Sequence, residues 1–261
     1  MKIFCVMGLA ALLAATGCAT SRTNMAAFRV LTYNIHHGEG IDRKTDLERI
    51  AELIKREKAD IVALQEVDRG VERTARRDFP AELARLTGMA VYFDRNIFYQ
   101  GGDYGNAVLT RFPIKQQKNT HYKMLRDGEQ RGVQQMVLSV NGKDLLFMNT
   151  HIDYRRDDSE RLINADELKG IVAAAGKMPV ILCGDFNDSP GSPMHLKIKN
   201  FLSDAWELVG VGSGFTIPTE NPRNRIDYIW ITENTIEPLR IEVLQSIASD
   251  HLPVLAEFRL R

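Results

Sequence analysis

Acidic, amide and imidazole side chains occur singly at the ends of apolar runs in this chain. The three clearest groups are Ser249-Asp250-His251, Gly184-Asp185-Phe186-Asn187 and Gln65-Glu66. Carboxylate and amide oxygens are the ligands that hard divalent cations prefer, and a histidine beside them can transfer a proton. The combination therefore predicts a metal-assisted hydrolytic site for phosphate esters.

The polar positions are tied to predicted strands. Four strand-like runs are followed by polar residues: 29–33 by Asn34, 61–64 by Glu66, 145–149 by His151, and 180–183 by Asp185 and Asn187. Two further runs are opened or preceded by them: 226–231 by Asp227, and 253–258 by Asp250 and His251. If the last two strands run antiparallel to the others, all these positions meet at one edge of the sheets, where loops display functional groups.

The predicted cluster needs positive charge. The carboxylates of Glu66, Asp185, Asp227 and Asp250 cannot gather without a cation, protons or a histidinium. The other ligands on offer are mostly hard oxygens, including the side-chain amides, which favours Mg²⁺ or Mn²⁺ over Zn²⁺. Zinc bound through two histidines, His151 and His251, stays as the alternative.

The remaining pattern predicts one domain over residues 28–261. The chain has 261 residues, 44% of them hydrophobic, which suffices for one large core. Strands are predicted over 28–33, 61–64, 90–93, 107–109, 133–140, 145–149, 180–183, 226–231, 241–244 and 253–258, and helices over 45–58, 79–86 and 158–175. A capping box from Thr45 to Glu48 opens the first helix, and Asn141-Gly142 predicts a hairpin. Mixed sheets covered by helices follow from this order.

The charge balance limits the partners. Lys and Arg total 34, as do Asp and Glu, and such a neutral chain does not depend on unspecific attraction to duplex nucleic acid. Two local groups of basic residues are Arg69, Arg73, Arg76 and Arg77, and Arg155, Arg156 and Arg161. We expect solvated polar faces at both, and we expect His195 on the surface.

The N-terminus has the pattern of an export signal. Lys2 precedes an apolar stretch over 3–15, which is too short to span a bilayer, and residues 1–17 are predicted to be a signal peptide. Ala15-Thr16-Gly17-Cys18 resembles a bacterial lipoprotein box, so Cys18 is expected to carry lipid and residues 18–27 to form a tether. The protein is then anchored to a bacterial membrane, periplasmic or at the outer surface; ordinary secretory cleavage and a secreted protein are the alternative. Cys183 is expected to be a small buried hydrophobe.

The ordered series of motifs resembles the endonuclease/exonuclease/phosphatase superfamily over residues 28–261. The matching motifs are Thr32-Tyr33-Asn34-Ile35, Leu64-Gln65-Glu66-Val67, Gly105-Asn106-Ala107-Val108, Asn149-Thr150-His151, Gly184-Asp185-Phe186-Asn187, Arg225-Ile226-Asp227-Tyr228 and Ser249-Asp250-His251. That superfamily includes pancreatic deoxyribonuclease, abasic-site repair endonucleases, neutral sphingomyelinases and inositol polyphosphate 5-phosphatases. The resemblance implies a four-layer α/β sandwich with two packed mixed sheets.

The resemblance also implies roles for individual residues. Glu66 would be the principal metal ligand, with Asn34 and Asp250 beside it. His251, oriented by Asp227, would lie close to the scissile phosphate. Asp185 and Asn187 would position water and a phosphoryl oxygen, and His151 would bond the phosphate. Repair endonucleases carry an acidic residue where this chain has His36, which distinguishes the chain from them.

These features predict an extracytoplasmic phosphodiesterase that uses in-line attack by water, with phosphomonoesters also open. Asn106 and Arg131 are further candidates for contacts with substrate. The substrate is expected to be a lipid headgroup, a small phosphodiester or nucleic acid, and the protein is expected to act as a monomer without a protein partner. A secreted or surface nuclease is one alternative, and a catalytically silent phosphate-binding module is another.

Overall fold

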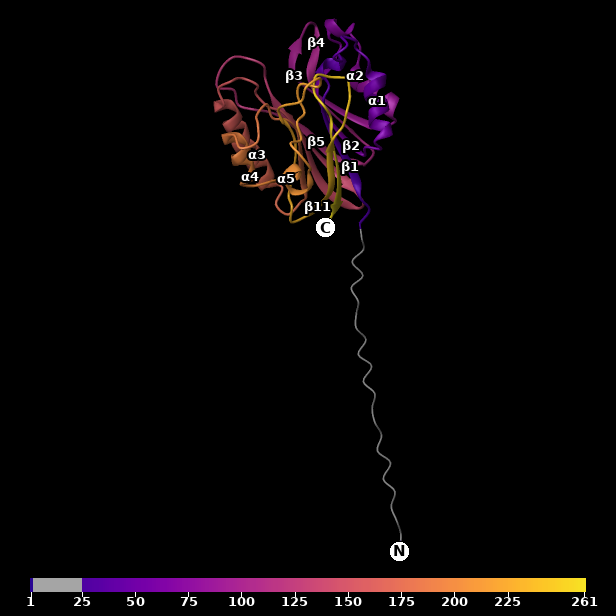
Figure 1. The fold of residues 1–261 in the computed structure, drawn as a ribbon, viewed down its shortest axis with the longest axis vertical. Helices are drawn as coiled ribbons and strands as arrows, with labels where there is room; N and C mark the ends of the chain where they lie inside the picture. Colours follow the sequence, from indigo (N-terminus) through magenta and orange to yellow (C-terminus); the bar gives the residue numbers. More distant parts are fainter. Residues whose placement is uncertain (2–24) are drawn as a thin grey trace.

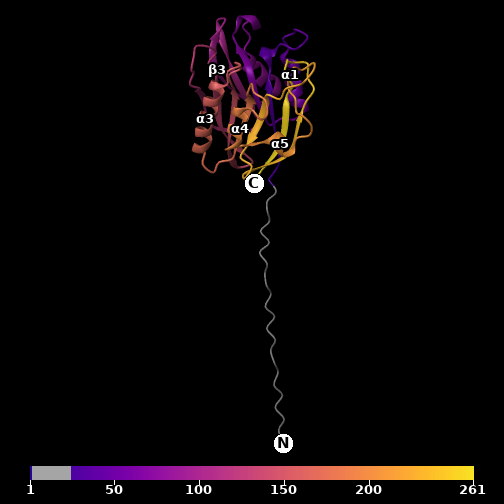
Figure 2. The same ribbon diagram turned by 60° about the vertical axis from the view of Figure 1, so that its left-hand side comes forward.

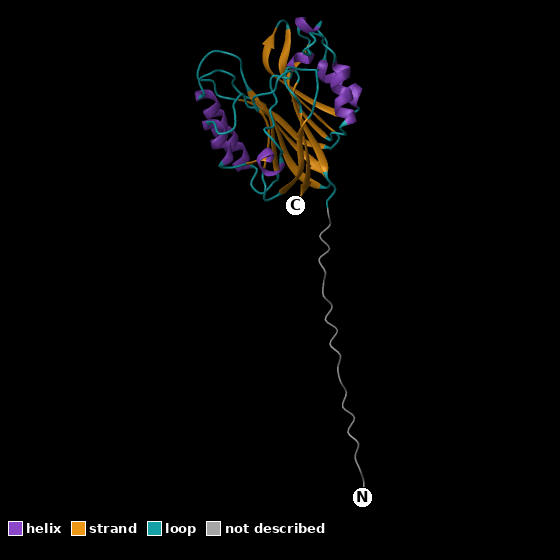
Figure 3. Cartoon of the chain, in the orientation of Figure 1, coloured by secondary structure: helices purple, strands orange, loops and turns teal. Residues whose placement is uncertain are grey.

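Two six-stranded mixed sheets pack face to face and carry helices on their outer faces (Figures 1 and 3). This computed structural model describes Met1 and residues 25–261. The first sheet has the order β11 (Ile236–Val243), β12 (Val254–Leu260), β1 (Phe28–Asn34), β2 (Ile61–Arg69), β4 (Gly102–Thr110), β3 (Ala90–Tyr99). The second has the order β5 (Ile114–His121), β6 (Gly132–Val140), β7 (Lys143–His151), β8 (Val180–Asp185), β10 (Asp227–Ile231), β9 (Ser203–Asp204). The expected four-layer α/β sandwich is confirmed.

Three apolar clusters form the core, because strand side chains alternate between two faces and each face is covered. Val30, Ile61 and Phe147 belong to the cluster between the sheets. The helices are α1 (Leu47–Arg56), α2 (Phe79–Thr87), α3 (Ser159–Ala174), α4 (Pro193–Lys199) and α5 (Ala205–Val209), with 3-10 turns η1 (His36–Gly38) and η2 (Glu72–Thr74). Helices α1 and α2 cover the first sheet, and α3 and α4 cover the second. Helix α5 packs on β10 and β11 and closes an edge of the inter-sheet layer (Figure 2).

The strand directions are those that a shared site requires. Strand β1 runs parallel to β2, and β7 runs parallel to β8. Strand β10 is antiparallel to β8, and β12 is antiparallel to β1. The carboxyl ends of β1, β2, β7 and β8 therefore lie with the amino ends of β10 and β12 at one end of the sandwich. In Figure 1 this is the end opposite the C-terminus.

Several local predictions need correction. Strands β5 and β9 and helices α4 and α5 were not predicted; β5 is an exposed edge strand without an apolar face, and the other three are short. The capping box at Thr45 is wrong. Asp46 is the N-cap of α1, and its Oδ1 accepts a hydrogen bond from the Arg49 backbone N–H at 3.2 Å. His195 is buried rather than exposed, since only 1% of its surface is accessible.

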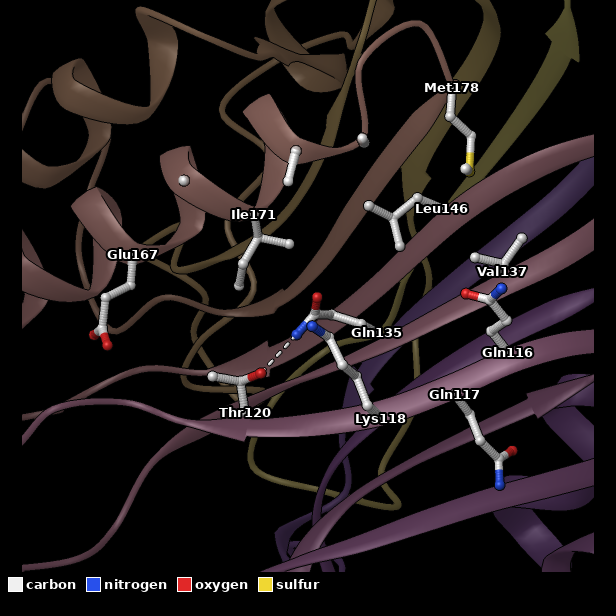
Figure 4. A pocket seen from close by; sticks show the side chains of 13 residues that line it. Gln116, Gln117, Lys118, Thr120, Gln135, Val137, Leu146, Glu167, Ile171 and Met178 are labelled. Carbon is white, nitrogen blue, oxygen red and sulfur yellow. Dashed lines mark hydrogen bonds between the residues drawn. The ribbon is translucent and has the colours of Figure 1, made fainter.

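A pocket of about 540 Å³ lies between α3 and the outer face of β5 and β6 (Figure 4). Ile171, Leu146 and Met178 give it an apolar side, and a hydrogen bond of 2.8 Å joins Gln135 Nε2 to Thr120 Oγ1 beside it. Its lining holds the two charged residues Lys118 and Glu167 and none of the predicted site residues. The pocket is thus a gap between a helix and an edge strand, separate from the predicted site.

The predicted signal peptide, the lipidation site Cys18 and most of the tether lie outside the described residues. In the described part of the chain, no helix combines the length and the apolar character needed to cross a membrane. Cys183 is a free, fully buried thiol in the inter-sheet core, which confirms its expected role as a small hydrophobe.

Candidate active site

The site forms where the inward-facing row of each central strand changes from apolar to polar. His151 ends β7, Asp185 ends β8 and Asp227 opens β10. The sheet register places Asp185 directly between the other two, opposite His151 on one side and opposite Asp227 on the other. Asn34 occupies the same position at the end of β1 in the facing sheet. Alternation along the strands and the packing of the sheets thus bring four polar side chains together.

His251 is held by a carboxylate on one side and by its own loop on the other. Its Nδ1 lies 2.9 Å from Asp227 Oδ2, and 5% of the residue is exposed. Ser249 Oγ donates to the Asn34 carbonyl at 2.7 Å and accepts from the His251 backbone N–H at 3.2 Å. The irregular segment before β12 therefore turns the imidazole into the site.

The negative charges around His251 affect the pKa of its imidazole more than its burial does. Burial alone would lower the pKa of the imidazole, but the carboxylates of Asp227, Asp185 and Asp250 raise it to about 10. His251 Nε2 faces Asp185 Oδ2 at 3.8 Å. The Asp227–imidazole pair is thus organised to hold a proton next to Asp185.

The Asp185 carboxylate contacts three other residues of the site. Its Oδ2 accepts a hydrogen bond from Asn34 Nδ2 at 3.0 Å and lies 3.4 Å from His151 Nε2, and its Oδ1 accepts from the Asn187 backbone N–H at 2.9 Å. Burial and the Asp227 charge raise its pKa to about 7, although His251 opposes the shift. This carboxyl group is therefore suited to exchange a proton near neutral pH.

His151 is the uncharged partner in the cluster. Burial, with added repulsion from Arg131 and His251, lowers its pKa well below the usual 6.5. Its Nε2 accepts a hydrogen bond from Asn187 Nδ2 at 3.1 Å. Since the same nitrogen of His151 lies 3.4 Å from Asp185 Oδ2, that contact places the Asn187 side chain in the same cluster.

Glu66 reaches the site through a β-bulge. Leu64 pairs with Ala107 and Val67 pairs with Gly105, so Gln65 and Glu66 together face the single residue between those two partners. Glu66 has a φ of +58°, a left-handed conformation that non-glycine residues seldom adopt. The bulge re-aims its carboxylate, whose Oε1 accepts a hydrogen bond from Asn34 Nδ2 at 3.0 Å. Asn34 thereby links Glu66 to Asp185 and the His251 side of the cluster.

A layer of buried amides supports this bulge and was missed at the sequence level. Asn149 Nδ2 lies 3.0 Å from the Leu64 carbonyl, the Ala107 carbonyl and Gln134 Oε1. Asn149 Oδ1 accepts from Gln65 Nε2 at 2.7 Å. Because Asn149 is fully buried, these contacts link the strand that carries the bulge and its neighbour to the facing sheet. The sequence did contain a signal for this layer, because Asn149 lies two residues before His151 and therefore on the same inward face of the strand.

The donor set suits a hard divalent cation. Potential ligand atoms of Asp185, Asp227 and His251 all lie within 4.8 Å of one another, and Asp227 Oδ1 is buried without a hydrogen-bond partner. Glu66 and Asp250 add half-exposed carboxylates at the mouth of the same cluster. Acidic oxygens that are gathered and incompletely paired fit Mg²⁺ or Mn²⁺.

Asn34 and Asp250 occupy specific places beside Glu66. The Asn34 amide nitrogen faces the carboxylates of Glu66 and Asp185, whereas its oxygen accepts from the His36 backbone N–H at 3.1 Å. Asp250 Oδ1 lies 3.3 Å from Ser249 Oγ and 3.9 Å from His36 Nδ1. The assignment of Glu66, Asn34 and Asp250 as metal ligands stays a prediction.

A second group of possible ligands has a different character. His195, Asp204 and Glu207 lie close together beneath the second sheet. His195 Nδ1 accepts from the Gly191 backbone N–H, so its proton is on Nε2, which faces Asp204 Oδ2 at 3.3 Å. Arg225 Nη1 donates to the same oxygen at 2.7 Å. These contacts form a buried ionic network that fixes Arg225, two residues before β10, against Asp204.

Asn106 and Arg131 flank the cluster without joining it. Asn106 is buried opposite the bulge that carries Glu66, and Arg131 is buried before β6 with Nη2 3.2 Å from Glu129 Oε2. Among the described residues, neither side chain hydrogen-bonds to the catalytic group. Their roles as substrate contacts stay predictions.

Sequence comparison gives the family. A model of the endonuclease/exonuclease/phosphatase family matches residues 31–251. The chain belongs to this family. Members of the family hydrolyse phosphate esters and typically use a divalent metal. The match covers every residue that the structure brings into the site, which supports the common origin of the cluster.

Individual relatives extend the comparison. The uncharacterized protein YbhP of Escherichia coli K12 is 30% identical over 259 residues, covering 92% of this chain and 99% of YbhP. A 5′-tyrosyl-DNA phosphodiesterase of Caenorhabditis elegans is 25% identical over 215 residues, covering 78% of this chain and 55% of that protein. The structure of a mannosyl-6-phosphatase from Bacteroides thetaiotaomicron VPI-5482 matches with a TM-score of 0.75 and 19% identity, covering 88% of this chain and 99% of that chain. The last likeness concerns the fold.

Proposed function

We propose that the protein is a metal-dependent extracytoplasmic phosphodiesterase that works by in-line attack of water. The observation that carries the proposal is the continuous contact series from Glu66 through Asn34 and Asp185 to the His251–Asp227 pair. It combines an acidic mouth suited to a cation with a proton-transferring group, which together are the requirements of phosphate-ester hydrolysis.

Each residue of the cluster has its own role in the proposed hydrolysis. Asp227 orients the imidazole of His251, which takes a proton from water or, as an imidazolium, stabilises the phosphoryl oxygens. Asp185 and Asn187 position the attacking water and a phosphoryl oxygen, and His151 hydrogen-bonds to the phosphate. Glu66, with Asn34 and Asp250 beside it, would hold a divalent cation, which would supply positive charge for the phosphoryl and leaving oxygens.

A nuclease is the second candidate, because a 5′-tyrosyl-DNA phosphodiesterase is among the relatives. A groove that tracks a nucleic-acid strand needs available cationic side chains. Most arginines of the two basic groups instead pair with neighbouring acids: Arg69–Asp103, Arg73–Asp68, Arg77–Glu82, Arg155–Asp153 and Arg161–Asp188. These pairs favour a small ester over a long strand. The assembled site gives no support to a silent binding module.

We further propose export and a lipid anchor at Cys18. The described chain approaches β1 beside the C-terminal strand, where Arg259 Nε donates to the Met25 carbonyl at 3.1 Å. The site lies at the other end of β1, so an anchor at Cys18 would attach the domain by the end opposite the site. In a bacterial host, Cys18→Ser should move the protein from the membrane to the soluble fraction. Unchanged fractionation would argue for another mode of attachment or for none.

The activity is tested with a substrate panel in Mg²⁺ and in EDTA. It comprises bis(p-nitrophenyl) phosphate, p-nitrophenyl phosphate, plasmid DNA, RNA, sphingomyelin and phosphatidylglycerol. We expect Mg²⁺-dependent hydrolysis of the aryl diester, lost in EDTA and in His251→Ala. Activity that persists in His251→Ala would indicate a contaminant, and no Mg²⁺-dependent hydrolysis of any ester would refute the proposal.

A further inference from the structure

An ion pair between Glu129 and Arg131 lies at the edge of the active site. Arg131 Nη2 is 3.2 Å from Glu129 Oε2, and the Arg131 side chain is 7% exposed, whereas that of Glu129 is 26% exposed. Arg131 directly precedes Gly132, which is the register partner of His151 at the end of β7. The pair therefore lies beside the strand end that carries His151.

The charges of this pair act on the catalytic group from two sides. Burial, followed by the positive charge of Arg131, lowers the pKa of His151. Burial raises the pKa of Glu129, the charge of Arg131 opposes that rise, and the negative charge of Glu66 adds to it. The pair is thus close enough to His151 and to Glu66 for its net charge to affect a phosphate bound there.

Neither member of the pair is fully satisfied by the other. Glu129 Oε1 and Arg131 Nε are both buried without a hydrogen-bond partner. Leaving buried polar atoms unpaired costs stability, and such costs need a physical reason. A carboxylate in this position is therefore poorly explained by stability alone.

The second arginine near Glu129 is also balanced by an acid. The charge of Arg73 acts on Glu129. Arg73 Nε and Nη2 each donate a hydrogen bond of 2.8 Å to the carboxylate of Asp68, which is fully buried. Arg131 and Arg73 thus each have a carboxylate partner, and this side of the site carries two guanidinium groups with little net positive charge.

Phosphate esters differ in the charge that they bring to such a site. A phosphodiester carries one negative charge, whereas a phosphomonoester carries about two above its second pKa of about 6. Groups that act equally on both classes cancel when the two are compared. At an effective dielectric constant of about 20, a fixed unit charge within roughly 10 Å changes the affinity for one additional ligand charge by about tenfold.

We propose that Glu129 is a specificity-determining residue that favours phosphodiesters over phosphomonoesters. Its carboxylate balances Arg131, so the second negative charge of a monoester meets no free arginine and is repelled by Glu129. This inference rests on the proposed phosphodiesterase function and specifies its substrate class as monoanionic diesters. In this role Glu129 neither holds the cation nor transfers a proton.

The test compares a diester and a monoester that share one leaving group. Values of kcat/KM for bis(p-nitrophenyl) phosphate and p-nitrophenyl phosphate are measured with Mg²⁺ at about pH 8, where the monoester is a dianion. Glu129→Gln should raise the monoester relative to the diester by about tenfold, mainly through KM. Glu129→Asp, which keeps the charge, should keep the wild-type ratio. Glu237→Gln is the matched control, because it removes a carboxylate paired with Arg259 at the end of the sandwich opposite the site.

Arg131→Gln changes the charge balance in the other direction. It leaves the Glu129 charge without a partner, so the monoester should fall further behind the diester. Because the two variants predict opposite shifts, either one that keeps the wild-type melting temperature is sufficient for the test. An unchanged ratio in folded Glu129→Gln, or a shift toward the monoester in folded Arg131→Gln, would overturn the role of Glu129.

A binding measurement separates failure of this inference from failure of the proposed function. Calorimetry in Mg²⁺ with inorganic phosphate, a dianion at about pH 8, and with dimethyl phosphate, a monoanion, needs no turnover. Glu129→Gln should improve the affinity for phosphate relative to dimethyl phosphate by about tenfold, and the gain should shrink as the salt concentration rises. The same relative affinity in variant and wild type would contradict the inference even if the aryl diester is hydrolysed. The expected change in binding without hydrolysis of any ester would instead refute the proposed function alone.

Discussion

Asn149→Ala should destabilise the protein far more than a comparable substitution at a buried asparagine nearby. The Asn149 side chain is fully buried, shares its amide protons among three oxygens at 3.0 Å and accepts from Gln65 Nε2 at 2.7 Å. At least three hydrogen bonds are lost, each contributing about 1 kcal/mol, and the groups left unpaired add about another 1 kcal/mol. We therefore expect the free energy of unfolding to fall by about 4 kcal/mol.

Asn106→Ala is the matched control. Asn106 is also an inward-facing asparagine of the site end and is 2% exposed, but its Nδ2 has no hydrogen-bond partner. Its removal should cost about 1 kcal/mol or less. Urea unfolding of both variants and of the wild type, followed by far-UV circular dichroism, gives the comparison. If the two variants lie within about 1 kcal/mol of each other, the supporting role of the amide layer is refuted.

Three further predictions concern the charged groups. Glu66→Gln should abolish both EDTA-sensitive activity and the rise in melting temperature that Mg²⁺ gives the wild type, which is measured by thermal scans. Asp227→Asn should lower kcat about 10²- to 10⁴-fold with a smaller change in KM, because His251 loses its orienting carboxylate; steady-state kinetics and an unchanged melting temperature check this. Burial raises the pKa of Asp204, but the hydrogen bond with His195 and the charge of Arg225 hold it below the usual 3.8. The resulting stability is complete above that value and is lost as the pH falls through the lower folded pKa, so Asp204→Asn should flatten the acid limb of a stability–pH curve.

The main strands and the site residues were predictable from local pattern. Apolar runs followed by a single acid, amide or histidine marked the ends of β1, β7 and β8, because a strand leaves the core where its inward row becomes polar. The directions in which the strands run could not be predicted from these apolar runs. They depended on how β10 and β12 pair, which the structure gives as antiparallel in both cases.

Other features depend on contacts between distant segments. Strand β5 has an exposed polar sequence and is recognised only by its pairing with β6. His195 has no apolar signature, yet α4 buries it against Tyr228 and Trp230. Its partner Asp204 follows it in the chain by 9 residues, and Arg225, which pairs with Asp204, follows it by 30 residues; no local pattern links the three.

The bulge at Glu66 explains why polar residues lie so deep between the sheets. Ile61 and Ala63 face the inter-sheet core, and strict alternation would turn Val67 to that face as well; instead Val67 packs on the helix-covered face. The extra residue thus reverses the alternation and frees Glu66 to face the site. Next to the bulge, the Leu64 and Ala107 carbonyls accept hydrogen bonds from Asn149 of the facing sheet, which an apolar residue at position 149 would not donate. The Asn149 amide therefore holds the bulge to the opposite sheet, through Gln65 and Leu64, and in this way supports the position of Glu66.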